Sequence, residues 1–209
     1  MNIWYGTAGL FKAQLSSGKI ATLCLLAFVL FPAVSQAQVP VYKITKEGSS
    51  VKFSVKASVT IAGTFDKWDS TLTFTSTELS TGVLDIKIQA DSVNTGSGTK
   101  DGKLKSKDFF DVTEDPYITF HSSKIVQTGP ETFDVPGTFT IRGVSKDETL
   151  TFTSHGKGTG KGSITGTMAF DRKQYGMNSG IPFIKIADRV EVIINLQGEH
   201  VSGPFPNFK

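Results

Sequence analysis

Apolar and polar residues alternate along most of this chain with a period of two, not with the longer period of a helix. From Val51 to Lys56 the sequence reads VKFSVK, with valine and phenylalanine on one face and lysine and serine on the other. The alternation returns in Leu84–Ala90 and in Val190–Leu196. Because successive side chains of a strand point to opposite faces, the pattern predicts sheet with one apolar and one solvated face.

The alternating segments amount to roughly eight or nine short strands, and turn residues such as Gly82, Gly143 and the glycine-rich stretch 156–162 separate them. Parallel strands would need a crossover connection, usually a helix, yet the helical pattern is confined to 99–112. We therefore expect an all-β antiparallel barrel or sandwich. A barrel is favoured because closure removes exposed strand edges, and about eight strands enclose room for side chains or one slim ligand.

The first 37 residues have the pattern of a secretory signal peptide. Lys12 and Lys19 precede an apolar run at 20–34, and Ser35-Gln36-Ala37 offers a small-x-small cleavage site. We expect cleavage after Ala37 and a periplasmic or secreted protein. An uncleaved anchor is the weaker alternative, since the run is shorter than the about 20 residues that span a bilayer.

The remaining residues, 38–209, contain no cysteine, because the one cysteine, Cys24, lies in the apolar run. This composition excludes disulfides, thiol catalysis and thiolate metal sites in the exported chain. The formal net charge of +3 arises partly from Lys12 and Lys19. Without a clustered basic face, we expect no nucleic-acid partner.

Catalytic signatures are sparse. The stretch HGKGTGKGS at 155–163 resembles a phosphate loop, but its glycine spacing fails, so a hairpin turn is favoured. The three histidines, His121, His155 and His200, lack metal-ligand spacing, and the first two have outward parity. We predict no catalytic residues, no metal site and no enzyme activity. A hydrolase that uses histidine and carboxylates is the alternative.

An outer-membrane barrel would also carry a signal peptide and alternating strands, but it needs apolar residues that face lipid. Here the outward positions are charged, at Lys52, Lys56, Asp85, Lys87 and Glu191. This pattern favours water outside the barrel and an apolar interior.

Phenylalanine is abundant, with 16 residues in the whole chain, and most of them have inward parity. Phe109 and Phe110 are unusual, because neighbours cannot share one face of a strand; on a short helix or turn, one could enter a cavity while the other packs on its rim. Arg172 continues the inward parity of Met168 and Phe170. It would either meet a polar ligand head or pair with an acid and plug the barrel end.

Two interiors are compatible with this parity, a ligand tunnel and a filled barrel that acts as a structural or partner-binding module. Large residues at every inward position would fill the barrel. Small residues at Ala57, Ala90, Gly137 and Gly166 favour the tunnel.

From Tyr42 to about Val201 the chain resembles the YceI family of secreted, lipocalin-like polyisoprenoid-binding proteins. The unit Asp-Phe-Phe-Asp-Val followed by Pro-x-Ile-x-Phe is the most specific part of the resemblance. The segments that carry the resemblance are Tyr42–Ile44, Ser49–Lys56, Gly63–Phe65, Leu104–Val112, Pro116–Phe120, Gly137–Val144 and Asp171–Gly176.

The resemblance implies an extended eight-stranded antiparallel lipocalin-like barrel with a short helical insertion, over residues 38–202. The proline-containing segment 203–209 lies outside the resemblance, and we expect it to be a mobile tail. The resemblance also implies an exported carrier or sequestering protein for a long-chain lipid, such as a polyisoprenoid or isoprenoid quinone. No catalytic residue and no other cofactor comes with the family. Transient membrane contact and a homodimer are compatible with this role.

The inward parity and the resemblance together define the expected ligand-binding residues. They are Phe53, Val55, Phe65, Leu72, Phe74, Leu84, Ile86, Ile88, Phe109, Phe110, Phe120, Phe139, Ile141, Phe152, Met168, Phe170 and Arg172.

Overall fold

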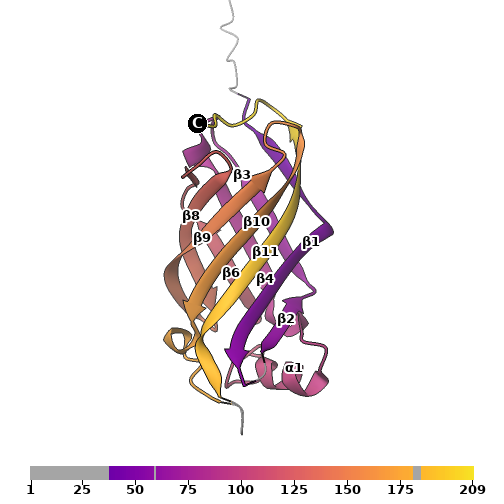
Figure 1. Ribbon diagram of the computed structural model, residues 1–209, viewed down its shortest axis with the longest axis vertical. Coiled ribbons are helices and arrows are strands. Elements are labelled where there is room, and N and C mark those ends of the chain that lie inside the picture. Colours follow the sequence, from indigo (N-terminus) through magenta and orange to yellow (C-terminus); the bar gives the residue numbers. More distant parts are fainter. Residues whose placement is uncertain (1–37, 59, 181–184) are drawn as a thin grey trace, which may run out of the picture. The chain divides into compact units, whose positions relative to one another are not determined.

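The computed structural model describes residues 38–58, 60–180 and 185–209, so the signal peptide expected at 1–37 lies outside the described residues. The described residues form one curled sheet of eleven strands (Figure 1). These strands are β1 (Val41–Ala57), β2 (Ile61–Phe65), β3 (Trp68–Thr73), β4 (Val83–Gln89), β5 (Val93–Asn94), β6 (Tyr117–Ser122), β7 (Val126–Gln127), β8 (Thr132–Ile141), β9 (Val144–His155), β10 (Lys161–Asp171) and β11 (Ile186–Ser202).

All strand pairs in this sheet are antiparallel, in the order β3-β4-β6-β8-β9-β10-β11-β1-β2-β5, with β7 paired to β8. The all-β antiparallel prediction is confirmed. The strand count exceeds eight because the chain bends at Asp66-Lys67, which separates β2 from β3, and because β5 and β7 are strands of two residues.

The sheet curls so that β3, at one end of the strand order, meets the first half of β1 along a seam. Among the described residues no ladder pairing joins these strands, and side chains bridge them instead. The Lys46 ammonium lies 2.9 Å from the Asp69 carboxylate and 3.9 Å from the centre of the Trp68 ring. Further along, the Tyr42 and Phe74 rings lie 5.9 Å apart. Side chains, not backbone hydrogen bonds, therefore close the wall here.

The inward positions of the strands form one continuous apolar core. Its centre is tightly filled, and Val135, Leu150 and Leu196 are fully buried. The space that the sequence led us to expect beside Gly137 and Gly166 is filled by neighbouring groups. The Phe152 ring lies over Gly166, and the Phe120 ring and the carbonyl of residue 121 lie against Gly137. Glycine at these positions makes room for neighbouring groups and does not leave a void.

The helical insertion is shorter than the 99–112 expected, and α1 spans Gly98–Lys105. The chain leaves helical geometry at Ser106, and Phe109 and Phe110 lie in the turn that follows. Short 3₁₀ segments complete the fold, namely η1 (Leu79–Thr81), η2 (Ala90–Ser92) and η3 (Arg172–Tyr175). No helix within 38–58, 60–180 and 185–209 is long and apolar enough to cross a membrane.

The segment 203–209, expected to be a mobile tail, makes specific contacts in the structure. The Asn207 amide donates to the Thr77 carbonyl at 2.8 Å, and the Lys209 amide donates to the Gln127 side chain at 2.7 Å. The Phe208 ring packs against Phe133, with centroids 6.3 Å apart. The tail therefore lies across the barrel end opposite α1 (Figure 1).

Candidate functional site

Within the described part of the chain, two cavities of the barrel interior stand out, and they share no lining residue. The α1-end chamber lies beside α1 and the turn that carries Phe109 and Phe110, with about 1030 Å³ of space between atoms, its opening included. The tail-end chamber lies beneath the tail and the β9–β10 hairpin, with about 900 Å³ measured in the same way. The interior is thus neither one open tunnel nor a completely filled core.

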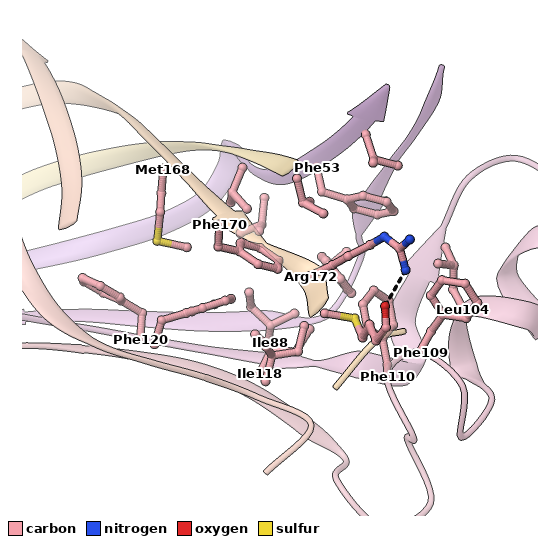
Figure 2. A pocket seen from close by; sticks show the side chains of 18 of the residues that line it. Phe53, Ile88, Leu104, Phe109, Phe110, Ile118, Phe120, Met168, Phe170 and Arg172 are labelled. Atoms are coloured by element: carbon pink, nitrogen blue, oxygen red, sulfur yellow. Dashed lines mark hydrogen bonds between the residues drawn. The ribbon is translucent and has the colours of Figure 1, made fainter. Parts of the chain in front are cut away.

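Inward side chains of β1, β4, β6, β8, β10 and β11 form the wall of the α1-end chamber. Figure 2 shows Phe53, Met168 and Phe170 on one side of this space, with Ile88, Ile118 and Phe120 on the other. Lys100, Thr119 and Arg172 are the only residues with polar side chains among the described lining residues. A surface of this kind favours an apolar chain, because burial of such a chain releases it from water.

Phe109 and Phe110 both line the α1-end chamber and both are buried. The Phe110 ring lies 5.7 Å from Phe65 and 6.5 Å, edge to face, from Phe53. Lys103 lies over the Phe109 ring at 5.7 Å. The turn therefore directs both rings inward, whereas the sequence suggested one ring inside and one on the rim.

Arg172 is only 6% exposed and is the first residue of η3, directly after β10 (Figure 2). It donates hydrogen bonds to the carbonyls of Ala187 at 3.2 Å, Ser179 at 2.9 Å and Met177. Its Nη2 atom also lies 3.3 Å from the Asp188 carboxylate. The guanidinium thus ties together the backbone around it, while its contact with a ligand head stays a prediction.

Asp188 links this arginine to the outside of the barrel. The hydrogen bond and charge of Lys173, at 2.9 Å, and then the charge of Arg172 hold the pKa of the Asp188 carboxyl below its usual range, although partial desolvation opposes them. The carboxylate is therefore charged near neutral pH and keeps the guanidinium paired.

Tyr175 supports the wall of the same chamber and is fully buried. Its ring packs edge to face against Phe170 at 5.2 Å and Phe139 at 5.6 Å, and its hydroxyl donates to Glu148 at 2.9 Å. Desolvation, followed by the hydrogen bond to Glu148, raises the pKa of Tyr175 far above its ordinary value. The phenol is thus a neutral donor that fixes two phenylalanines.

The tail-end chamber differs from the α1-end chamber at its opening. Its inner wall is apolar, with Phe74, Phe133 and Ile164, but the hairpin brings His155, Lys157 and Lys161 to its rim. The tail contributes Phe205 and Phe208 to the lining. Sequence reasoning missed these two residues because the tail lies beyond the family-like pattern; two phenylalanines within the last five residues were the available signal.

Every residue that the sequence singled out as ligand-binding lines one of the two chambers. The tail-end chamber holds Leu72, Phe74, Leu84 and Phe152. The α1-end chamber holds Phe53, Val55, Phe65, Ile86, Ile88, Phe109, Phe110, Phe120, Phe139, Ile141, Met168, Phe170 and Arg172. The parity argument thus predicted the inward direction, whereas contact with a ligand stays a prediction.

Two of the three histidines lie near exposed carboxylates, while His200 stacks on Phe205. His121 Nδ1 lies 2.6 Å from Asp85 Oδ1, and His155 Nδ1 lies 3.8 Å from Glu131 Oε2, with all four side chains exposed. Within the part of the chain that the structure describes, no group of three or more histidine, cysteine or acidic side chains could hold a metal ion.

Known proteins share this architecture and sequence. A family model described as the YceI-like domain matches residues 42–198. A UPF0312 protein of Pseudomonas syringae pv. syringae is 28% identical over 165 residues, which cover 75% of this chain and 86% of the relative. A UPF0312 protein of Pseudomonas aeruginosa is 28% identical over 188 residues, 85% of this chain and 96% of the relative.

Solved structures extend the comparison. BcnA of Burkholderia cenocepacia aligns with a TM-score of 0.67 at 24% identity, over 74% of this chain and 99% of that protein. The YceI protein of Campylobacter jejuni gives 0.57 at 28% identity, over 68% and 86%. A polyisoprenoid-binding domain from Saccharophagus degradans gives 0.59 at 18% identity, over 78% and 99%, which shows a shared fold.

Proposed function

The chain belongs to the YceI-like domain family, and on that premise we propose that it is an exported carrier that holds a long-chain isoprenoid, quinone-like or similar amphiphilic lipid without chemical turnover. The observation that carries the proposal is the α1-end chamber, whose wall is apolar on almost every side. The guanidinium of Arg172 already donates hydrogen bonds to backbone carbonyls. An apolar chain in the chamber would therefore not bury an unpaired charge.

The energetics of such binding are favourable but weakly selective. At about 0.3 kcal/mol per heavy atom, a chain of roughly 40 carbons would gain on the order of 12 kcal/mol, which corresponds to nanomolar affinity at best. Apolar contact distinguishes length and width better than functional groups. Finer specificity would come from the few polar groups near the chambers, such as Lys157 and Lys161 at the tail-end rim.

Two further observations support the proposal. The Saccharophagus degradans domain that shares the fold is described as polyisoprenoid-binding, an analogy of fold, not of site. The signal-peptide pattern at 1–37 supports export. Transient membrane contact and homodimerisation would suit a carrier and belong to the same proposal.

A filled barrel that binds a protein partner is the second candidate, and the tight centre of the core favours it. The two chambers share no lining residue, and aromatic rings occupy the niches beside Gly137 and Gly166. Under this alternative the chambers would stay empty and the outer surface would carry the function.

Native mass spectrometry and solvent extraction of residues 38–209 separate the two candidates. The carrier retains a co-purified lipid, or binds added ubiquinone with one-to-one stoichiometry. A Met168→Trp variant, which narrows the α1-end chamber, should retain less of this adduct. An Ile193→Trp variant is the matched control, because Ile193 is exposed and lies beside Val192, the β11 partner of Met168. No lipid and no bound quinone in the folded wild-type protein would contradict the carrier.

A further inference from the structure

A single layer of inward residues separates the two chambers. On β10, Met168 lines the α1-end chamber and Ile164 lines the tail-end chamber, while Gly166 between them lines neither. On β11, Ile194 lines the first chamber, and the next inward residue, Leu196, lines neither. Since inward positions on a strand are about 7 Å apart, the partition is about one side chain thick.

The partition is dry and offers a chain no polar obstacle. Val135 of β8 and Leu196 of β11 are 0% exposed and contribute only hydrocarbon. Ser122 of β6 is also fully buried, but its hydroxyl accepts a hydrogen bond from the Leu84 amide at 2.8 Å. Passage between the chambers therefore depends on steric fit, not on desolvation of an unpaired group.

One aromatic ring fills the weakest point of this layer. Phe152 lines the tail-end chamber, and its ring leans over its register partner Gly166 on β10. A Cβ atom at 166 would lie 2.7 Å from Cδ1 of this ring and closer still to Cε1. Its other near contact is the side chain of Leu150 at 3.4 Å. The niche that glycine leaves in the wall is thus occupied by a side chain alone.

The second glycine of the layer is different. A Cβ atom at Gly137 would lie 2.9 Å from the Phe120 ring, but it would also meet the backbone of His121 and Ser122. The wall is closed there whether or not the ring moves. Of these two glycines, only Gly166 therefore has a niche that is filled by side chains alone.

We propose that Phe152, seated in the niche over Gly166, is the gate that decides how long an apolar chain the barrel accepts. A short chain fits within one chamber and leaves the ring in place. A long chain passes from one chamber to the other only when the ring swings out of the niche into another rotamer. The inference rests on the proposed function, because it takes an apolar chain as the ligand.

The test compares farnesol with solanesol, two prenols that differ in chain length, by native mass spectrometry of residues 38–209 loaded from detergent micelles. Phe152→Ala empties the niche, so it should raise the retention of solanesol relative to farnesol by about tenfold. In Phe152→Ala/Gly166→Val, a side chain refills the niche without the original ring, and the ratio should return to the wild-type value or below.

Thr151→Ala is the matched control. Thr151 directly precedes Phe152 on β9, but its side chain is exposed and lines neither chamber. Its loss should leave the solanesol-to-farnesol ratio unchanged. The gate is refuted if Phe152→Ala leaves the ratio at the wild-type value, or if Thr151→Ala changes it equally. If the wild-type protein retains neither prenol, the carrier function itself fails; farnesol retained with an unaltered ratio refutes the gate alone.

Discussion

The two ends of the barrel are closed in different ways. At the α1 end, the turn after α1 packs Phe109 and Phe110 into the core, and buried Arg172 binds three backbone carbonyls. At the opposite end, a glycine-rich hairpin and the tail cover the tail-end chamber, and Phe205 stacks on His200 while remaining 39% exposed. The residues that close the α1 end are part of the core, whereas the segments that close the opposite end lie on its surface.

The difference has a consequence for dynamics. Segments with few buried contacts and exposed hydrogen bonds open at low free energy, whereas buried clusters open only with the whole domain. The tail-end closure, which depends on contacts of Asn207, Phe208 and Lys209 with Thr77, β8 and β7, fits the first class. We expect the tail end to open independently, while the α1 end holds the fold together.

The largest predicted effect comes from removal of one aromatic ring at each end. Phe110→Ala should lower the free energy of unfolding by about 3 to 5 kcal/mol, because it leaves a cavity between Phe53 and Phe65. Phe205→Ala should cost about 1 kcal/mol, since its ring is partly in water already. Urea denaturation of both variants measures the difference; equal losses would show that the ends are closed equally firmly.

Arg172→Met tests the buried charge at the α1 end. The variant leaves three carbonyls without their donor, so we expect a loss of about 3 kcal/mol in chemical denaturation. Arg189→Met is the matched control, because Arg189 is mostly exposed and pairs with Glu191 only at 3.8 Å. Its expected change is below about 1 kcal/mol. An Arg172→Met protein as stable as the wild type would show that the guanidinium does not stabilise the α1 end.

Truncation after Ser202 tests how much the tail contributes to closure of its end of the barrel. It removes the Asn207 and Lys209 hydrogen bonds and the Phe208 ring, with an expected loss of about 2 kcal/mol. Hydrogen exchange should show faster exchange in β7 and in 77–81, with unchanged protection in β10 near Arg172. Global loss of protection would mean that the tail is part of the core.

The smallest predicted effect is a pH dependence of stability at the α1 end, which comes from Asp188. The pKa of Asp188 is lowered in the folded protein, mainly by Lys173. A carboxyl with a lowered folded pKa stabilises the fold above its unfolded pKa of about 3.9, and this contribution is lost as pH falls through the folded value. Unfolding of Asp188→Asn should therefore depend less on pH below about 4 than that of the wild type. An identical pH profile would contradict the role of this carboxylate.

The parity of the strands predicted much of this molecule. An alternating sequence has only one way to bury Phe53, Phe120 and Met168 together, so the all-β class and the inward residues followed from local pattern. The division of the interior could not be read in the same way. Whether Gly166 leaves a void depends on where the Phe152 ring from the neighbouring strand lies, and rotamers are set by packing.

The tail shows a second limit of sequence reasoning. Its short polar and proline-containing sequence resembles an unanchored terminus, and its partners, Thr77 and Gln127, lie more than seventy residues away. Arg172 is intermediate, because its inward parity was evident while the choice between a ligand head and a backbone anchor depended on the carbonyls around it.

The central claim is that an apolar chain occupies the α1-end chamber. Crystals of residues 38–209 grown with a prenol that carries bromine at the end of its chain test this claim most directly. We predict an anomalous-difference peak inside the barrel, within contact distance of side chains such as Phe53, Phe120 or Met168. A bromine peak found only on the outer surface, with the chamber empty, would contradict the account.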